Sequence, residues 1–212
     1  MRRCFVFSAG TFYGLYERPE APDFCIAADA GRLLCEKLNI TPDLVIGDFD
    51  SAPKPEDAPC ITVPVEKDDT DTMLAAKEGL HLGYTTFYFY GATGGARLDH
   101  TLANLQTLAY LRRHGARGYL YDQNFCYTVM ENEELPLPQT VPWGLLSAFA
   151  LGDRAEGVTI RGVQYPAENA TIANDFPLGV SNHITEKTAT VRVENGLLLV
   201  GWELPKKDGT LL

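Results

Sequence analysis

The stretch "DLVIGDFDS" at residues 43–51 places two like charges, Asp48 and Asp50, directly after an apolar run. The run is typical of a short buried strand, and ligands of open parallel sheets bind where such strands end. In extended geometry residues two apart point the same way, so we expect both carboxylates on one side. Because two close anions repel, the pair favours a cation between them, and Mg²⁺ takes such oxygen ligands. The alternative is a plain turn, since these residue types also form turns.

Around this stretch, short apolar runs alternate with helical patterns over the first two thirds of the chain. Strands that alternate with helices predict a mainly parallel sheet with helices on both faces. The last helix carries leucines three apart, which predict one buried stripe made of Leu102, Leu105, Leu108 and Leu111. Strands are expected within residues 3–9, 23–29, 43–50, 60–65, 85–92 and 117–122, and helices at 31–38, 70–82 and 100–114.

The composition changes near Glu131, where "ENEELPLPQTVPWG" at residues 131–144 is acidic and rich in proline and is interpreted as a linker. Short strand candidates follow, and "TATVRVENGLLLVG" at residues 188–201 predicts a hairpin with Asn195-Gly196 as its turn. The sequence therefore predicts an α/β domain at residues 1–132 and a smaller all-β domain at residues 133–212.

A second acidic cluster follows the strand expected at residues 60–65. The motif "EKDDTDT" holds Asp68, Asp69 and Asp71 at the start of a helix. One such residue is explained by capping of the helix, but three aspartates in four positions exceed what a cap needs. A further aspartate, Asp29 in "AADAG", ends another strand, where a helix cap is the simpler interpretation.

A glycine-rich cluster, "GATGGARLDH" at residues 91–100, lies between a predicted strand and the longest helix. Gly94 and Gly95 allow close backbone approach, and the start of a helix favours anions. Arg97 can bind a phosphate through two N–H groups, whereas Asp99 is either a ligand or a cap. If the strands are parallel, these clusters converge on one edge, which predicts a Mg²⁺-dependent site for phosphate chemistry.

The overall composition of the chain limits the classes of binding partner that we expect. The 212 residues carry a formal net charge of -10, which disfavours sequence-independent binding to nucleic acid. The five cysteines contain no C-x-x-C pair, so buried free thiols in a reducing cytoplasm are expected. No apolar run is long enough to span a membrane. We therefore expect a cytoplasmic protein with no nucleic-acid or membrane partner.

Taken together, "ADAG", "GDFDS", "KDDTD" and "GGARLDH", in this order and with the later "GVQYP" and "GVSNHI", resemble the thiamine pyrophosphokinase family. The resemblance covers most of the chain and is specific in combination. One departure is Ala30, because the family often has two glycines after the first aspartate.

The resemblance implies a Rossmann-like α/β catalytic domain that binds ATP and Mg²⁺, followed by a thiamine-binding β-sandwich. It implies transfer of a pyrophosphoryl group from ATP to the hydroxyl of thiamine, giving thiamine diphosphate and AMP, in a homodimer with active sites between subunits. The implied catalytic residues are Asp48, Asp50, Asp71 and Asp99, of which Asp48, Asp50 and Asp71 hold Mg²⁺. The implied ATP-binding residues are Asp29, Lys67, Asp68, Gly94, Gly95 and Arg97, and the thiamine-binding residues are Tyr165, Ser181 and Asn182.

For the reaction we expect in-line attack of the thiamine oxygen on the β-phosphorus of ATP, with Asp71 or Asp99 accepting the proton. Tyr165 is expected to stack on the cationic, aromatic substrate, although a strand aromatic is often only part of a core. Ser181 and Asn182 have a plain turn as their alternative. Other functions remain open: an aspartyl phosphatase, a thiamine or nucleotide sensor, and a pyrophosphokinase for another heterocyclic alcohol such as a pterin.

Overall fold

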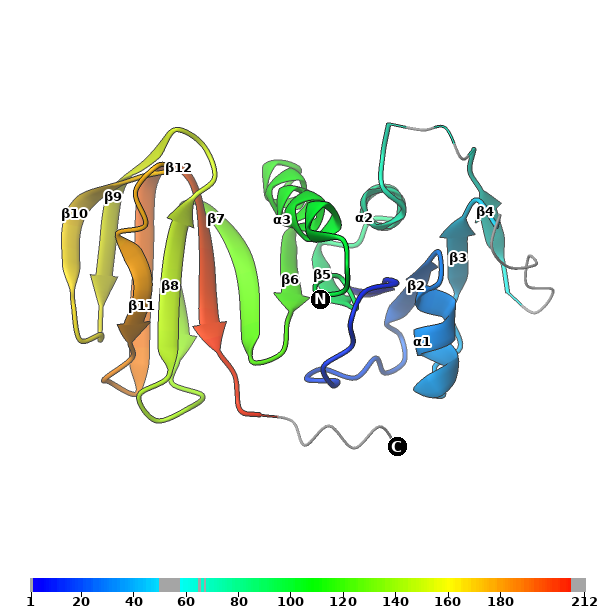
Figure 1. Ribbon diagram of the computed structural model, residues 1–212, viewed down its shortest axis with the longest axis horizontal. Coiled ribbons are helices and arrows are strands. Elements are labelled where there is room, and N and C mark those ends of the chain that lie inside the picture. Colours follow the sequence, from blue (N-terminus) through cyan, green and yellow to red (C-terminus); the bar gives the residue numbers. More distant parts are fainter. Residues whose placement is uncertain (1, 50–57, 65, 67, 207–212) are drawn as a thin grey trace. The chain divides into compact units, whose positions relative to one another are not determined.

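The computed structural model describes residues 2–49, 58–64, 66 and 68–206 (Figure 1). The chain divides between Gln123 and Asn124 into two compact units, earlier than the boundary expected at residues 132/133. We call the part up to Gln123 the α/β unit and residues 124–206 the β unit, and each is described by itself.

The α/β unit is built on a parallel sheet, as the alternation of strands and helices predicts. Within the described residues its strand order is β4-β3-β2-β1-β5-β6, and every neighbouring pair is parallel. The central strands are apolar and buried on both faces, as expected for a sheet covered on both sides. The strands are β1 (Arg3–Phe7), β2 (Phe24–Ala28), β3 (Leu44–Gly47), β4 (Cys60–Thr62), β5 (Thr86–Tyr90) and β6 (Arg117–Tyr121).

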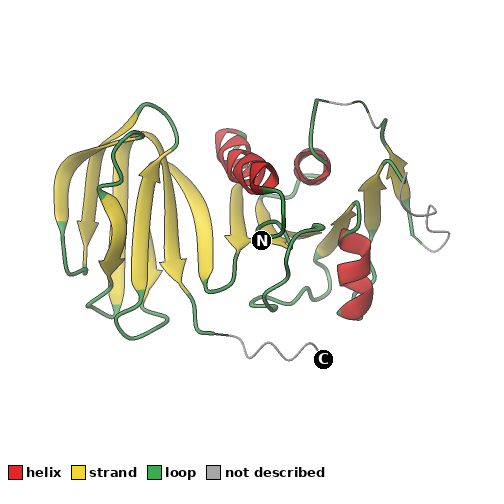
Figure 2. Ribbon diagram, viewed as in Figure 1, coloured by secondary structure: helices red, strands yellow, loops and turns green. Residues whose placement is uncertain are grey.

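Helices lie on both faces of this sheet (Figure 2). α2 (Asp71–His81) and α3 (Leu98–Arg113) cover one face, and α1 (Gly31–Lys37) covers the other. The glycine at position 118 in β6 gives α3 its close approach, because a Cβ there would meet Leu108 and Leu111. None of the helices in the described part of the chain has the length and apolarity needed to cross a membrane.

The leucine stripe expected on α3 is only partly buried. Leu108 and Leu111 are in the core, but Leu102 is 55% exposed, so its predicted burial is wrong. The buried positions of the helix are Asn104, Thr107, Leu108 and Leu111, which follow the helical repeat of 3.6 residues better than a strict spacing of three. The first turns of α3 therefore present apolar side chains outside the core of the α/β unit.

The order of the strands reverses at β1. From β1 the chain runs through β2, β3 and β4 toward one edge, and β5 and β6 then occupy the other side of β1. The connections leaving β1 and β5 therefore diverge, which opens a crevice at the carboxyl ends of these two neighbouring strands. Ligands of doubly wound sheets bind at this kind of position.

The β unit is an antiparallel sandwich organised by one long strand. The first half of β12 (Thr188–Glu203) pairs with β9 and the second half pairs with β8, while β7 follows it along its length. β10 extends the sheet beyond β9, and β11 extends it beyond β8. The other strands are β7 (Phe125–Pro138), β8 (Leu145–Ala150), β9 (Arg154–Arg161), β10 (Ala167–Ala173) and β11 (Gly179–His183).

Two expectations for this unit are wrong. Residues 131–138 are part of β7, so the acidic, proline-rich segment is a strand and not a linker. The residues expected to form a hairpin belong to the continuous strand β12, and Asn195-Gly196 lies at a bulge between Val193 and Leu197. A bulge bends a strand sharply, and here the bend carries β12 from β9 to β8.

The cysteines are free, as expected. Four of them are buried and Cys60 is partly buried. Burial away from water raises the pKa of the Cys25 and Cys35 thiols to about 12, because the charged thiolate is poorly solvated there. These thiols are therefore packing groups, with little thiolate at neutral pH.

The α3 packing gives a stability prediction. Leu111→Ala should lower the free energy of unfolding by about 2–5 kcal/mol, because it leaves a cavity against β6. Leu102→Ala, at an exposed position of the same helix, should change it by no more than about 0.5 kcal/mol. Urea unfolding of both variants measures the difference, and equal losses would contradict the assigned face of α3.

Candidate functional site

A cavity of about 260 Å³ lies at the crevice between the carboxyl ends of β1 and β5. Its wall includes the residues that leave β1 and β5, the end of β2, and the starts of α2 and α3. All of these elements belong to the α/β unit. The segments that line the cavity are residues 8–10, 28–29, 70–72 and 91–97, together with His100, Thr101 and Asn104 of α3.

Several of the predicted site residues meet in this cavity. Asp29, Asp71, Gly94, Gly95 and Arg97 all line it, although they come from three separate sequence clusters. The convergence follows from the parallel sheet, because the ends of all its strands meet at one edge. Asp48, Asp68 and Asp99 are not among the residues of the cavity wall. Asp50 and Lys67 lie outside the described residues.

Uncharged polar side chains link the floor of the cavity to the helices, and the sequence analysis did not single them out. The Ser8 hydroxyl, at the end of β1, lies 2.9 Å from the Thr72 hydroxyl in the first turn of α2. The Asn104 side chain is buried and donates a 2.6 Å hydrogen bond to the carbonyl of Ala92. A polar residue in the middle of an otherwise buried helix face is the signal that marks Asn104.

The glycine-rich turn at residues 91–97 depends on close backbone packing. Gly94 has a φ of +70°, and a Cβ at this position would lie 2.5 Å from the Tyr13 hydroxyl. Glycine is required here both for the left-handed backbone and for the contact. The turn leads directly into α3. The first backbone N–H groups of this helix have no partner within the helix and lie at the end that is next to the cavity.

The acidic cluster before α2 divides into separate roles. The helix cap is Thr70, whose hydroxyl accepts a hydrogen bond from the Met73 N–H at 3.1 Å. Asp69 is held by Lys77, with nitrogen–oxygen distances of 2.7 and 2.8 Å, and this hydrogen bond raises the pKa of the lysine. Asp71 lies in the first turn of α2 and lines the cavity, whereas Asp68 is exposed.

The backbone takes left-handed φ angles just after β2 and β3, at Asp29 and Phe49. Asp29 has a φ of +52°, and α1 has no side-chain cap, so the capping interpretation of Asp29 is wrong. Its carboxylate lies beside Gly47, 3.9 Å from the position that a Cβ there would take. Phe49 has a φ of +55°, so the extended geometry assumed for residues 48–50 is wrong at its centre.

Arg97 and Asp99 are paired with each other. Arg97 donates hydrogen bonds to Asp99 from two nitrogens, Nε at 2.9 and 3.2 Å and Nη2 at 2.6 Å, and both side chains are more than 60% exposed. The hydrogen bond from Arg97 is the main cause that lowers the pKa of Asp99 to about 2. Arg97 thus holds a carboxylate in the two-pronged geometry with which arginine also binds phosphate.

No group of three or more His, Cys, Asp or Glu side chains within the described ranges is arranged to hold a metal ion. Mg²⁺ needs fewer protein ligands, since it is usually bound by one or two carboxylates together with waters and substrate phosphates. The carboxylate oxygens of Asp29 and Asp71 at the cavity wall are the kind of donor that Mg²⁺ prefers. The donor set therefore fits this ion chemically.

In the β unit, Tyr165 is held on the surface by Asn182. The Asn182 side chain accepts a hydrogen bond from the Tyr165 N–H at 3.0 Å and donates one to the Tyr165 carbonyl at 2.7 Å. The Tyr165 side chain is 66% exposed, so the alternative that it is part of the sandwich core is wrong. Ser181 has a φ of +59°, and its backbone N–H donates a hydrogen bond to Ser147 Oγ at 3.1 Å.

A second exposed aromatic residue, Trp143, lies near β11, the strand that contains Asn182. Trp143 is exposed, and its ring meets the His183 ring edge-on with 5.9 Å between centroids. His183 Nδ1 also lies 2.7 Å from the Trp143 carbonyl oxygen. The sequence analysis assigned neither residue to a site, although His183 lies within the "GVSNHI" motif quoted there.

Two family models match the sequence. The thiamin pyrophosphokinase catalytic domain matches residues 18–120, and the thiamin pyrophosphokinase vitamin B1 binding domain matches residues 135–198. The first range contains all of the cavity wall except the segment at residues 8–10. The second contains Tyr165, Ser181 and Asn182. No curated protein matches the chain in sequence at a significant level.

Solved structures share the fold over nearly the whole chain. Thiamine pyrophosphokinase from Bacillus subtilis superposes with a TM-score of 0.87 at 22% identity, covering 96% of this chain and 99% of that one. A thiamin pyrophosphokinase family protein from Enterococcus faecalis gives 0.82 at 26% identity, with 97% and 100% covered. Thiamin pyrophosphokinase from Candida albicans gives 0.76 at 14% identity, with 96% and 89% covered.

The Arg97–Asp99 pair gives a titration prediction. In the Arg97→Gln variant the pKa of Asp99 should rise from about 2 toward the ordinary aspartate value of about 4, because the hydrogen bonds that favour its charged form are lost. The carboxyl carbon signal of Asp99, followed by NMR between about pH 1.5 and 6, measures this shift in the variant and in the wild-type protein. An unchanged pKa would contradict the pairing.

Proposed function

We propose that this chain, which belongs to the thiamin pyrophosphokinase family, transfers the pyrophosphoryl group of ATP to the hydroxyl of thiamine and releases AMP. The observation that carries the proposal is the cavity between β1 and β5, where Asp29, Asp71, Gly94 and Arg97 meet. A glycine-rich turn, a helix start and an arginine together suit a polyphosphate. Phosphoryl transfer needs mainly positioning and charge neutralisation, which this arrangement supplies.

Arg97 is proposed to bind the triphosphate by exchanging partners. Its two N–H groups hold Asp99 in the free protein, and a phosphate oxygen pair offers the same two-pronged acceptor. The exchange costs little, because both side chains are exposed and the pair is screened by water. It also frees the Asp99 carboxylate at the moment when the phosphates arrive.

Asp48, Asp50 and Asp71 are proposed to hold Mg²⁺, with Asp29 and Asp68 nearby as contacts to the metal–nucleotide complex. When bound, the ion neutralises the triphosphate and the charge that develops during transfer. Lys67 is proposed to add positive charge to the same region. Asp50 and Lys67 lie outside the described residues, so their parts in this proposal rest on the sequence motif alone.

In the proposed reaction the hydroxyl oxygen of thiamine attacks the β-phosphorus of ATP. A new oxygen–phosphorus bond forms, and the bond between the β-phosphorus and the oxygen that bridges to the α-phosphorus breaks, so AMP leaves. The hydroxyl proton passes to Asp71 or Asp99. Asp71 lines the cavity and Asp99 follows the arginine, so both remain candidates for this role.

Thiamine is proposed to bind to the β unit through Tyr165, Ser181 and Asn182. The exposed Tyr165 ring offers a face to a cationic thiazolium and a flat pyrimidine. Asn182 uses its side-chain amide on the Tyr165 backbone, so we assign it the role of holding the ring in place. We further propose a cytoplasmic homodimer whose active sites lie between subunits, with no nucleic-acid or membrane partner.

The direct test incubates the purified protein with ATP, Mg²⁺ and thiamine and quantifies AMP and thiamine diphosphate. Equal amounts of both products, formed only when thiamine is present, are expected. Nucleotide binding without AMP formation would contradict the substrate assignment and favour a sensor or another alcohol. Phosphate release from simple phosphoesters, with Asp48 required, would favour the phosphatase alternative.

The carboxylates give a mutational prediction. Asp48→Asn and Asp71→Asn should each lower kcat by at least about 10²–10³, because charge stabilisation at the phosphates is lost. Asp153→Asn, an exposed aspartate of the β unit, is the matched control and should retain full activity. Circular dichroism checks that all three variants are folded, and near-normal turnover of Asp48→Asn would remove that residue from the metal site.

Tyr165 gives a prediction that separates the two substrates. Tyr165→Ala should raise KM for thiamine about tenfold, since a cation–π contact of this kind is worth roughly 1–2 kcal/mol. KM for ATP should stay within about twofold, because the assigned nucleotide site lies in the α/β unit. Initial rates with each substrate varied in turn measure both constants. A similar rise in KM for ATP and KM for thiamine would contradict a thiamine-specific role.

A further inference from the structure

The segment from Ser8 to Asp23, here called the strap, connects β1 to β2 without a helix or strand of its own. It begins in the cavity wall, because Ser8, Ala9 and Gly10 line the cavity. It then crosses to the far end of β1 and leads into β2. An irregular segment of this length keeps one conformation only where specific contacts hold it.

The first contacts join the strap to the glycine-rich turn. The N–H groups of Gly10 and Thr11 donate hydrogen bonds to the carbonyls of Gly91 and Thr93, at 2.6 and 2.9 Å. A Cβ on Gly10 would lie 2.5 Å from the Gly91 oxygen, so the two backbones are as close as glycine allows. The Tyr13 hydroxyl and the Thr11 side chain then pack against Gly94. The strap therefore forms one side of the turn that leads to Arg97.

The second contact is the hydroxyl of Tyr90. This oxygen accepts a hydrogen bond from the Glu17 N–H at 2.7 Å and donates one to the Glu17 carbonyl at 3.0 Å. The residue is 1% exposed, and its ring stacks on Tyr121 and Phe7 with centroid distances of 4.8 and 5.8 Å. A hydroxyl on so fixed a ring holds the middle of the strap at a defined place.

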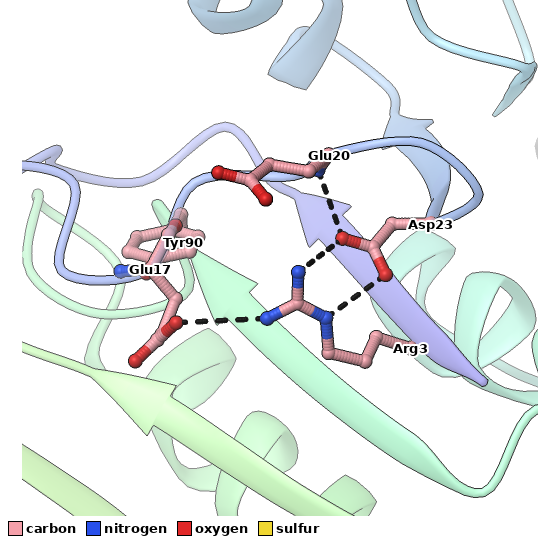
Figure 3. Close-up of polar contacts among 5 residues, drawn as sticks. All are labelled: Arg3, Glu17, Glu20, Asp23 and Tyr90. Carbon is pink, nitrogen blue, oxygen red and sulfur yellow. Dashed lines mark hydrogen bonds and ion pairs between the residues drawn. The ribbon is translucent and has the colours of Figure 1, made fainter. Parts of the chain in front are cut away.

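The third contact is Arg3 of β1, which holds the end of the strap (Figure 3). Arg3 donates two hydrogen bonds to Asp23, with 2.9 Å between Nε and Oδ1, and lies 3.6 Å from a Glu17 carboxylate oxygen. Asp23 also accepts the Glu20 N–H at 2.9 Å. Burial raises the pKa of Asp23, but the hydrogen bonds from Arg3 and Glu20 outweigh this and lower it.

We propose that Tyr90 is a positioning residue for triphosphate binding, acting through the strap, with Arg3 as its support. The inference rests on the proposed function for its ligand. Tyr90 is the last residue of β5, and its carbonyl also accepts the Ser8 N–H at 2.8 Å, so one residue holds both the start and the middle of the strap. The next residue is Gly91, where the turn begins. Tyr90 therefore fixes the strap and the phosphate-binding turn relative to each other.

The test removes one oxygen atom. Tyr90→Phe keeps the stacked ring and loses both hydrogen bonds to Glu17. KM for ATP should rise about three- to tenfold, while KM for thiamine and kcat stay within about twofold. Hydrogen exchange of the free protein should speed up by at least about fivefold at the amides of Glu17 and Thr11.

Tyr84→Phe is the matched control, because Tyr84 is also buried in the α/β unit but precedes the other end of β5. It should change neither KM nor the exchange of the strap amides. Asp23→Asn is the second variant and should shift the same quantities as Tyr90→Phe by a smaller factor. The pKa of Asp23 is lowered in the folded protein, so its charged carboxylate stabilises the fold at neutral pH. This stabilisation is lost as the pH falls through the pKa of the folded protein.

The proposal is overturned if Tyr90→Phe speeds exchange only at Glu17, with Thr11 and KM for ATP unchanged, since the hydroxyl would then act locally. It is also overturned if both KM values rise together with a general loss of protection, which indicates a structural role alone. Failure of the proposed function gives a different result: the wild-type chain forms no AMP. In that case the positioning role is tested by the effect of Tyr90→Phe on the dissociation constant for ATP with Mg²⁺. If ATP does not bind, it is tested by hydrogen exchange at the Thr11 amide.

Discussion

The α/β unit depends on the close contact between the backbones that leave β1 and β5. These strands are neighbours, but the chain leaves them in different directions, toward β2 and toward α3. The hydrogen bonds from Gly10 to Gly91 and from Thr11 to Thr93 hold the two exits together. Because glycine backbones meet there, the wall is lined by peptide groups and small side chains, and space remains beside it for a ligand.

The same constraint explains why acids and glycines converge without a contiguous motif. Each cluster follows its own strand, and a parallel sheet brings every strand end to one edge. Asp29 comes from the end of β2, Asp71 from the start of α2, and Arg97 from the start of α3. Buried links such as Ser8 to Thr72 and Asn104 to Ala92 fix these elements to one another. A rigid, prearranged site of this kind suits chemistry that depends on positioning.

In the α/β unit the sequence predicted the strands, the helices and much of the cavity wall. The apolar runs of β1, β2, β3 and β5 and the helical patterns of α2 and α3 lie where they were expected. The strap was not predicted, because its order comes from Tyr90 and Arg3, which are distant in sequence from Glu17 and have no local pattern. The pairing of Arg97 with Asp99 was also missed, since both were assigned separately to ligands.

The β unit was predicted less well, for reasons that follow from its geometry. β7 contains Pro136 and Pro138, which suggested a linker, yet a strand tolerates proline where no ladder N–H is required. Asn195-Gly196 is a strong hairpin signal, but here the left-handed Gly196 serves a bulge that bends β12 between two partners. Local turn chemistry alone does not distinguish these outcomes. The place of Tyr165 was not predicted either, because its backbone is held by Asn182 of β11 across the connection between β9 and β10.

The central claim is that the crevice between β1 and β5 binds the triphosphate. A crystal structure of the protein with Mg²⁺ and a non-hydrolysable ATP analogue tests it most directly. The account predicts phosphate density against the turn at residues 91–97 and the start of α2, with Arg97 turned from Asp99 to a phosphate oxygen. Density for the phosphates at any other place, with Arg97 still paired to Asp99, would contradict it.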